Sequence, residues 1–427
     1  MPRTHVIGAG LAGLSAAVSL LAQKHAVVLH EASGRAGGRC RSFADARLGC
    51  SIDNGNHLLL SGNQSTARYL SLIGAANALV GPKKACFPFF DVGSGRRWML
   101  RPNAGLVPWW IFHPGRRTPG ASAWSHLSAL ALMLAGPGRT VADCVGSRGV
   151  LFERFWEPLA VAALNMPATE GAAQLLQPVL RETFAKGEAA CRPLIAARGL
   201  SDAFVDPALA WLRAQGAELQ FKRRLTQIER SNERAETLRF GERRVRLGAD
   251  DRVVLAVPPQ AAAGLLPGLA APLQSSPIVN VHFRLSQPAD IPAQLPFLGL
   301  IGGTAQWLFI RGEVASVTIS AAAGLVHESA AVLAERTWRD VAAALAANPA
   351  SLPPYRVVKE KRATFVQTPE QARLRPGAAS AFANVFLAGD WTATGLPATI
   401  ESAVRSGEIA ARAIVRQTGR PARRPLA

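Results

Sequence analysis

Three glycines near the N-terminus, Gly8, Gly10 and Gly13, have the spacing of a dinucleotide-binding turn. They follow a short apolar run and open an apolar helix. In such a turn the first glycine permits the tight bend, the second lets a pyrophosphate approach the backbone, and the third lets helix and strand pack closely. The start of the helix, at Leu11 and Ala12, then offers free N–H groups and a partial positive charge to the phosphates.

A carboxylate stands where the adenosine ribose of such a ligand would lie. The run 26–30 predicts a second buried strand, and Glu31 and Ala32 follow it directly. A carboxylate at this strand end accepts hydrogen bonds from both ribose hydroxyls. The strand, helix, strand and acid together predict a dinucleotide site.

The loop 34–42 decides between FAD and NAD. It combines the paired glycines Gly37 and Gly38 with three arginines, among them Arg35 and Arg39. Arginines at this place neutralise a pyrophosphate, while the glycines let the loop lie against the ribityl chain of a flavin. We therefore expect FAD, bound in part by Arg35 and Arg39.

The pattern Arg-x-Gly-Gly-Arg-x-x-Ser in this loop resembles the flavin family that contains amine oxidases, protoporphyrinogen oxidases and carotenoid desaturases. The resemblance implies an α/β fold in which a discontinuous Rossmann-type FAD-binding domain is joined to an interleaved α+β substrate domain. We expect the FAD-binding domain at 1–80, 200–275 and 375–427, and the substrate domain at 81–199 and 276–374. The resemblance also implies that backbone near Leu225 lies beside the adenine.

The closing segment supplies further parts of the same site. The run 384–390 predicts a buried strand that ends in Gly389 and Asp390, and the resemblance implies that Asp390 binds the ribityl hydroxyls. A helix begins near Ala398, so we expect Ala398, Thr399 and Ile400 to present a helix N-terminus to the pyrimidine edge, where its dipole stabilises the negative charge of reduced flavin. No cysteine follows position 191, so the family's thioether to the flavin is absent and FAD is expected to be noncovalent.

The stretch 53–63 carries titratable side chains, and the resemblance places it past the reactive face of the flavin. We expect Asn54, Gly55 and Asn56 to contact the cofactor. Asp53 and His57 are candidates for acid–base chemistry, and a structural pair is the alternative.

Together with 392–401, the stretch 53–63 resembles the hydroxysqualene dehydroxylases, also called squalene-associated FAD-dependent desaturases. This resemblance covers essentially the whole chain and implies reduction of hydroxysqualene to squalene with loss of water, which feeds hopanoid synthesis. The hydroxyl is allylic, so protonating it as water leaves gives a stabilised cation that accepts hydride from reduced FAD. Asp53, His57 and Glu401 are the candidates to supply the proton or steady the cation, and the sequence does not choose among them.

Other functions stay open at this point. The opposite redox direction gives a phytoene-type desaturase or an amine oxidase, of which the latter is less favoured because the stretches near the site suggest aliphatic walls. A prenyl-binding protein of the Rab escort type is disfavoured because such proteins lack a complete FAD set. A second Gly-x-Gly-x-x-Gly motif is absent from the sequence, so the electron donor is unidentified.

Composition limits the partners. The formal net charge is +19, yet the arginine-rich stretch 222–252 alternates with apolar residues as in a β-meander, and no nucleic-acid-binding motif is present. The five cysteines are odd in number and none has CxxC spacing, so we expect free thiols in a reducing cytoplasm and no metal site.

The sequence disfavours a membrane-spanning helix and leaves contact with a membrane surface open. Outside the apolar N-terminal stretch, the longest apolar run, 127–135, is far below the roughly 20 residues that span a bilayer. However, aromatic and arginine residues at 108–117 precede an apolar helix that we expect at about 122–134, an arrangement typical of a monotopic interface helix. We expect an apolar isoprenoid substrate and peripheral contact with the cytoplasmic face of the inner membrane.

Overall fold

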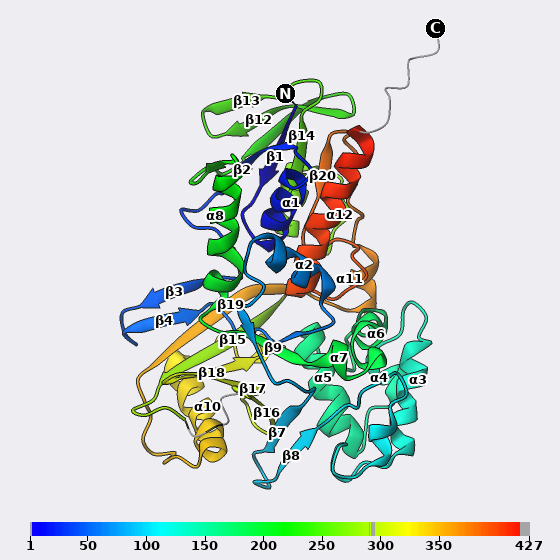
Figure 1. Cartoon of the computed structure of the whole chain (residues 1–427), viewed down its shortest axis with the longest axis vertical. Coiled ribbons are helices and arrows are strands. Elements are labelled where there is room, and N and C mark those ends of the chain that lie inside the picture. The colour runs from blue at the N-terminus through cyan, green and yellow to red at the C-terminus, as the bar shows by residue number, and fades with distance from the viewer. Residues whose placement is uncertain (1, 290, 292–294, 419–427) are drawn as a thin grey trace.

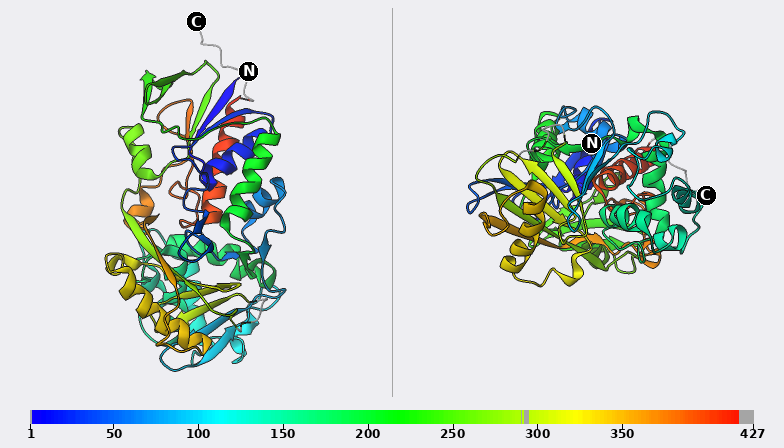
Figure 2. Two further views of the ribbon diagram at one scale, coloured as in Figure 1. Left: turned by 90° about the vertical axis from the view of Figure 1, so that its left-hand side faces the viewer. Right: turned by 90° about the horizontal axis from the view of Figure 1, so that it is seen from below.

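In the computed structural model, which describes residues 2–289, 291 and 295–418, two large sheets occupy opposite ends of an elongated molecule (Figure 1). The N-terminus lies at the end that holds the smaller of these two sheets. The side view in Figure 2 shows that sheet with its helices at one end and the larger sheet with α10 at the other.

The smaller sheet is parallel and has five strands in the order β10-β2-β1-β14-β20. Their bounds are β1 Arg3–Ile7, β2 Ala26–His30, β10 Glu218–Gln220, β14 Arg252–Leu255 and β20 Val385–Leu387. The central strands are nearly continuous apolar runs, as expected for a sheet covered on both faces. Because β1, β14 and β20 come from distant parts of the chain, this Rossmann-type unit is discontinuous, and the fold predicted from the sequence is confirmed.

Helices α1 (Leu11–Leu21) and α12 (Ile400–Thr418) pack closely against each other beside this sheet. A Cβ atom on Gly407 would lie 2.3 Å from the carbonyl oxygen of Ala12, so only glycine permits this approach. The hydroxyl of Ser15 donates to the carbonyl of Val404 at 2.7 Å across the same contact. This contact holds the first and last helices of the fold together.

The larger sheet has seven strands in the order β19-β15-β18-β17-β16-β7-β8. Their bounds are β7 Phe87–Asp91, β8 Arg97–Leu100, β15 Ser275–Arg284, β16 Phe297–Ile301, β17 Trp307–Arg311, β18 Val314–Ile319 and β19 Tyr355–Phe365. Helix α10 (Ala330–Leu345) covers one face, where Trp338 packs on Phe283 with ring centroids 5.2 Å apart. All neighbouring strands are antiparallel except β7 and β16, which run parallel.

Smaller elements complete the fold. Three short sheets are formed by β3 Ser42–Asp45 with β4 Cys50–Asp53, by β5 Leu59–Leu60 with β9 Pro193–Ala196 and β6 Leu79–Val80, and by the arginine-rich meander β11 Gln227–Ser231, β12 Arg234–Phe240 and β13 Arg243–Arg246. The remaining helices are α2 Gln64–Leu72, α4 Val141–Val145, α5 Glu157–Leu164, α6 Ala173–Glu182, α7 Glu188–Cys191, α8 Asp206–Ala214, α9 Pro259–Leu265 and α11 Pro369–Arg373.

The prediction of a single apolar helix at about 122–134 is wrong. The structure has a 3₁₀ turn at Trp124–Leu127 followed by the short helix α3, Ser128–Met133. The Ser125 hydroxyl donates to the carbonyl of Ser122 at 2.7 Å, and the His126 ring contacts the same carbonyl. Side chains that bond to this carbonyl compete with the main chain and break the helix at its start.

Candidate functional site

A cavity of about 700 Å³ begins where the parallel strands β1, β2, β14 and β20 end and extends to the face of the seven-stranded sheet. It gathers most of the site residues expected from the sequence: Gly8, Gly10, Leu11, Ala12, Glu31, Ala32, Gly37, Gly38, Arg39, Asn54, Gly55, Asn56, His57, Leu225, Gly389, Asp390, Ala398, Thr399, Ile400 and Glu401. The expected site residues Gly13, Arg35 and Asp53 are not part of its wall.

The glycine turn after β1 has the geometry that a pyrophosphate needs. Gly8 has φ +104°, and a Cβ there would lie 2.4 Å from the carbonyl oxygen of Ala256. A Cβ on Gly13 would lie 1.8 Å from the carbonyl oxygen of Gly8, so Gly13 acts in packing, as expected. Gly10 faces open space in the cavity wall and begins α1 without a side-chain cap, which leaves the helix N-terminus to the ligand.

Hydrogen bonds from the backbone fix the Glu31 carboxylate just after the end of β2. Its two carboxylate oxygens accept the backbone N–H groups of Ala9 and Ser33, each at 2.8 Å. Beside it the buried His30 contacts His5 at 3.1 Å through ring nitrogens and stacks on Phe240. Burial lowers the pKa of His30 to about 3, so this pair is neutral at neutral pH.

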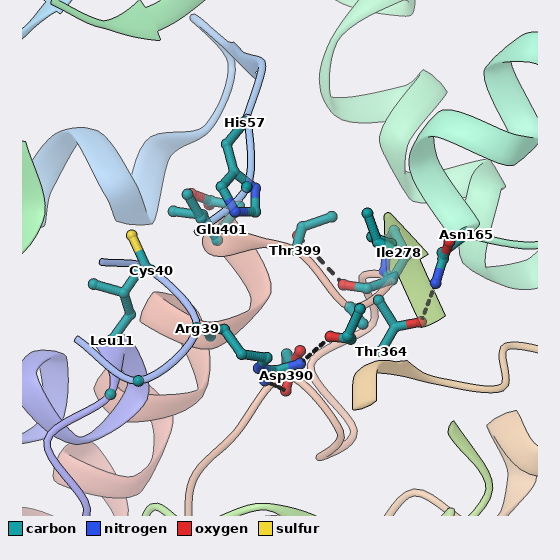
Figure 3. Close-up of a pocket in the computed structure, with 18 of the residues that line it drawn as sticks. Leu11, Arg39, Cys40, His57, Asn165, Ile278, Thr364, Asp390, Thr399 and Glu401 are labelled. Carbon is teal, nitrogen blue, oxygen red and sulfur yellow. Dashed lines mark hydrogen bonds and ion pairs between the residues drawn. The ribbon is translucent and has the colours of Figure 1, made fainter. Parts of the chain in front are cut away.

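The second glycine loop meets the first across the cavity. The N–H of Gly37 donates to the carbonyl of Ala9 at 2.8 Å, and Gly38 approaches Gly10 so closely that a Cβ on Gly38 would lie 3.4 Å from its Cα. Arg39 reaches across to Asp390 and forms an ion pair at 2.8 Å (Figure 3). Arg35 is exposed and is not part of the cavity wall, contrary to the expectation.

The end of β20 and the start of α12 form the opposite wall. The N–H of Gly389 donates to the Ser406 hydroxyl at 2.8 Å, and Arg375 donates to the carbonyl of Asp390 at 3.1 Å. The Thr399 hydroxyl accepts the N–H of Ser402 at 3.2 Å, as an N-cap does. Arg375 and Ser406 hold the loop around Asp390, and no local sequence pattern indicates either contact.

Asp53 does not stand at the cavity, and its carboxylate is already bound. It forms an ion pair with Arg311 at 2.7 Å, and it accepts the N–H of Leu200 at 3.0 Å and the Ser42 hydroxyl. The side chain is 6% exposed. These contacts tie the β3–β4 hairpin to the seven-stranded sheet, so the structural alternative fits Asp53 better than acid–base chemistry.

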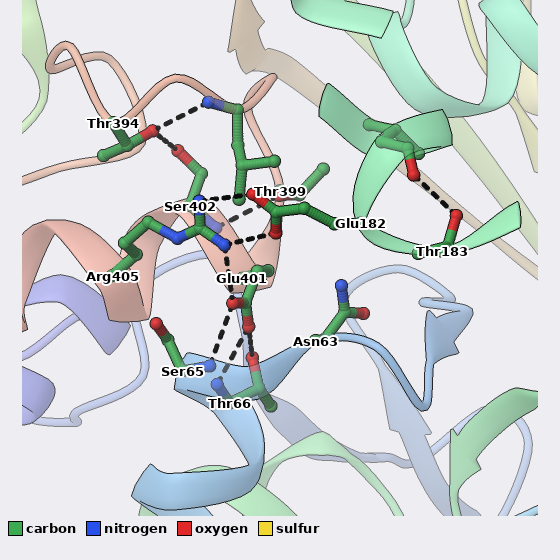
Figure 4. A network of polar contacts seen from close by, with 12 residues as sticks. Asn63, Ser65, Thr66, Glu182, Thr183, Thr394, Thr399, Glu401, Ser402 and Arg405 are labelled. Carbon is green, nitrogen blue, oxygen red and sulfur yellow. Dashed lines mark hydrogen bonds and ion pairs between the residues drawn. The ribbon is translucent and has the colours of Figure 1, made fainter. Parts of the chain in front are cut away.

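Glu401 is part of the cavity wall, but its two carboxylate oxygens accept hydrogen bonds from other parts of the protein. They accept the N–H groups of Ser65 and Thr66 at 2.9 and 2.8 Å, and the Thr66 hydroxyl at 2.7 Å (Figure 4). Arg405 adds an ion pair at 3.2 Å. Glu401 therefore caps the N-terminus of α2, a role that its position in the sequence did not reveal.

His57 lies in the cavity wall and is labelled in Figure 3. Burial lowers the pKa of His57 to about 4; the nearby Asp53 opposes this shift, and Arg39 adds to it. The ring is thus neutral at neutral pH in the cofactor-free protein. Cys40 stands in the same wall, and burial raises the pKa of its thiol, so it too is neutral.

Beyond the glycine loops the cavity wall is mostly apolar. Its side chains include Leu58, Leu60, Phe87, Phe89, Phe155, Leu159, Val179, Phe184, Ile278, Trp307 and Phe309. The expectation of aliphatic walls is therefore only half right, because aromatic rings are as prominent. Sequence reasoning also missed the polar strip on the sheet floor, where the Asn165 amide donates to Thr364 at 3.0 Å and the Thr318 hydroxyl donates to Asn280 at 2.8 Å.

Arg223 and Arg224 line the cavity beside Leu225. The sequence assigned these arginines only to a solvated strand face. Within the described residues, no group of three or more His, Cys, Asp or Glu side chains is arranged to hold a metal ion. All five cysteines are free.

A group of exposed apolar side chains, called the surface patch below, lies on the segment 106–134, which includes the 3₁₀ turns Trp109–Phe112 and Trp124–Leu127 and the helix α3. It consists of Leu106, Val107, Trp109, Phe112, Trp124, Leu127, Leu130 and Leu134, all of them exposed. Arg116 lies over the Trp109 ring at 4.8 Å, at the edge of this patch. None of the described helices has the length and apolar character needed to cross a bilayer.

The chain is similar to known proteins over nearly its whole length. Residues 11–415 match the family described as flavin containing amine oxidoreductase. The chain is 45% identical over 412 residues to the hydroxysqualene dehydroxylase of Sinorhizobium fredii, covering 96% of this chain and 98% of that protein. It is 46% identical over 408 residues to the hydroxysqualene dehydroxylase of Rhodopseudomonas palustris, covering 95% and 97%. Among solved structures, cyclohexylamine oxidase from Brevibacterium oxydans superposes with a TM-score of 0.70 at 17% identity, over 98% of this chain and 100% of that one.

Proposed function

Because the chain belongs to the family of flavin containing amine oxidoreductases and is an FAD-dependent enzyme, we propose that it reduces hydroxysqualene to squalene for hopanoid synthesis. The carbon–oxygen bond breaks, a carbon–hydrogen bond forms at the same carbon, and the oxygen leaves as water. When bound, FAD in its reduced form would supply the hydride, which carries both electrons, and a proton would accompany the departing oxygen. Similarity over nearly the full length to proteins named for this reaction supports the proposal.

One observation carries it. The cavity that contains the dinucleotide features at Gly10, Glu31 and Asp390 continues without a break into a wall of leucine and phenylalanine side chains. Burying such a wall against a hydrocarbon is favourable by roughly 25 cal/mol per Å² of apolar surface removed from water. The wall therefore suits a long apolar isoprenoid that must lie beside the flavin.

We assign to His57 the role of donating the proton that accompanies the departing oxygen. Asp53 is bound to Arg311 outside the cavity wall, and Glu401 is bound to α2 and to Arg405. His57 faces the cavity, but its pKa of about 4 leaves it neutral at pH 7. A negative charge beside the ring raises that pKa. With such a charge beside the ring, His57 would hold a proton at neutral pH and would release it to the departing hydroxyl.

The surface patch at 106–134 is the part of the enzyme that contacts the membrane. Tryptophans beside arginines suit the headgroup layer, and the exposed leucines in and next to α3, Leu127, Leu130 and Leu134, suit the acyl boundary. Residues Trp110 and Ile111 of the same segment turn inward and pack with Phe87 and Leu100, which line the cavity. We place the enzyme at the cytoplasmic face of the inner membrane, where an isoprenoid reaches the cavity without crossing water.

The decisive experiment uses the FAD-loaded protein after chemical reduction without oxygen. Incubation with hydroxysqualene is expected to yield one squalene per reduced flavin, measured by mass spectrometry, while the flavin absorbance returns. The oxidised protein with phytoene is the control for the opposite redox direction. Absence of squalene together with desaturation of phytoene by the oxidised protein would overturn the proposal.

A further inference from the structure

The side chain of Arg405 joins the helices α12 and α6 at the edge of the cavity (Figure 4). From α12 it forms two parallel bonds to the carboxylate of Glu182 at the end of α6, at 3.0 and 2.6 Å. The same guanidinium contacts Glu401, one turn earlier on α12, at 3.2 Å. Paired bonds of this kind are strong and fix the orientation of both partners.

On the cofactor side, Arg405 is tied to the first turn of α12. Glu401 follows Thr399 and Ile400, which line the cavity where the helix begins. Its carboxylate is 3% exposed and also caps α2, whose own N-cap residue Asn63 makes no side-chain cap bond. Movement of this first turn would therefore displace Glu401 and, through their ion pair, the guanidinium of Arg405.

On the substrate side, the last turn of α6 needs outside support. Pro178 stands inside this helix and removes one of its main-chain hydrogen bonds. The helix stops at Thr183, and Phe184 follows in the cavity wall, stacked on Phe87 with ring centroids 5.9 Å apart. Phe184 also meets the edge of Phe155 at 6.4 Å. The position of Glu182 thus sets the position of the aromatic wall.

The ion pair between Arg405 and Glu182 is partly shielded from water. The side chains of Arg405 and Glu182 are 20% and 27% exposed, whereas Arg68, in its ion pair with Glu408 between α2 and α12, is 54% exposed. Loss of Arg405 leaves the partly buried Glu182 carboxylate without its ion-pair partner, and loss of Glu182 leaves Arg405 with Glu401 alone. The contact therefore holds the wall of α6 against the start of α12.

We propose that Arg405 is a positioning residue that couples binding of the cofactor at α12 to binding of the apolar substrate against α6. When FAD orders the first turn of α12, the ion pair to Glu182 holds Phe184 in the wall, and the hydrocarbon finds its site already formed. Linkage requires the reverse as well, so a bound hydrocarbon tightens FAD binding at equilibrium by the same factor by which FAD strengthens hydrocarbon binding. The inference rests on the proposed function for the identity of the hydrocarbon.

The test measures the affinity for FAD with and without saturating squalene in detergent. In the parent protein squalene is expected to tighten FAD binding at least about fivefold, the lower end of typical coupling between sites. In Glu182→Gln and in Arg405→Gln this factor falls to near one, and Arg405→Lys, which keeps the charge but not the two parallel bonds, is intermediate. Arg68→Gln is the matched control, because it breaks an ion pair between α2 and α12 without touching α6, and it keeps the parent factor.

A second readout does not depend on squalene. Loading with FAD is expected to increase hydrogen-exchange protection of residues 173–187 in the parent and in Arg68→Gln, but not in Glu182→Gln. Unchanged protection in the parent, or an equal gain in Glu182→Gln, overturns the coupling. If squalene leaves FAD affinity unaltered in every variant while the exchange pattern is as expected, the coupling through Arg405 holds and the proposed hydrocarbon is wrong.

Discussion

Arg39 and Asp390 are 351 residues apart in the chain and form an ion pair at 2.8 Å across the mouth of the cofactor cavity. The Asp390 carboxylate beside it raises the pKa of Arg39, so Arg39 carries its positive charge. Arg39 belongs to the second glycine loop, and Asp390 lies in the loop that follows β20. The two halves of the FAD site are thus joined to each other by the protein itself.

Replacing Asp390 with Ala is expected to weaken FAD binding about 10- to 100-fold, because a charged hydrogen-bond partner is lost and Arg39 is left unpaired. Quenching of flavin fluorescence on titration gives the affinity. Asp250→Ala, at an exposed loop residue away from the cavity, is the control and keeps the parent affinity. Equal affinities for the two variants would show that Asp390 does not hold the cofactor.

Glu401→Gln should lower the free energy of unfolding by about 1–3 kcal/mol, because the buried carboxylate caps α2 and balances the charge of Arg405. Urea denaturation of the FAD-saturated protein measures this loss. Glu408→Gln removes a carboxylate whose partner Arg68 is largely exposed, so a smaller loss is expected there. A Glu401→Gln protein as stable as the parent would contradict the capping role.

The pH dependence of stability follows from buried histidines. Burial lowers the pKa of His282 from 6.5 to about 4, a shift that Asp53 and Asp45 oppose and Arg311 increases. The unfolded chain therefore binds the proton first, and stability that is complete above pH 6.5 is lost as the pH falls toward 4. His282→Asn should lose about 2 kcal/mol less than the parent between pH 7 and pH 5.

Urea denaturation of the FAD-loaded proteins at both pH values gives this difference. His327→Asn replaces an exposed histidine and serves as the control with the parent dependence. The same loss in the parent and in His282→Asn would mean that His282 is not the group that titrates.

The sequence predicted those parts of the site that short-range rules determine. Glycines at turns, an acid at a strand end and a helix start after Asp390 each need only neighbours in the chain, and the structure has them at the cavity. The exceptions depend on distant partners. Asp53 is bound by Arg311, 258 residues away, and Glu401 by Ser65 and Thr66 at the start of another helix. No local sequence pattern indicates such distant partners. From the sequence alone, Asp53 and Glu401 are therefore both candidate acids.

The helix break before Ser128 has a similar cause. Apolar periodicity favoured one helix over 122–134, but hydrogen bonds of serine and histidine side chains to the Ser122 carbonyl outweigh it. The break spreads the apolar side chains over a surface rather than along one helix face.

Membrane binding should depend on that surface. Trp124 and Leu130 are 74% and 60% exposed, and replacing either by Ser should weaken binding to vesicles of phosphatidylcholine and phosphatidylglycerol about 10- to 100-fold, because burying a large apolar side chain contributes roughly 1.5–3 kcal/mol. Sedimentation with the vesicles measures the bound fraction. Leu273→Ser, at an exposed leucine outside the patch, is expected to bind like the parent. Equal binding of all three variants would exclude the patch as the contact.

The close contact between α1 and α12 gives the sharpest test of the fold around the cofactor. An alanine Cβ at Gly407 would lie 2.3 Å from the carbonyl oxygen of Ala12 and 2.6 Å from the backbone nitrogen of Ala16, and backbone atoms of a packed helix cannot move aside as a side chain can. Gly407→Ala should therefore cost about 1–3 kcal/mol in urea denaturation. Because α1 begins at the pyrophosphate turn, its displacement should also weaken FAD binding.

Gly264→Ala is the matched control, since Gly264 lies in helix α9 and a Cβ there meets no atom within 4 Å. Alanine favours the helix over glycine by up to about 1 kcal/mol, so this variant should be as stable as the parent or more stable. If Gly407→Ala and Gly264→Ala unfold at the same urea concentration, the two helices tolerate a methyl group between them and their close approach does not determine the shape of the FAD site.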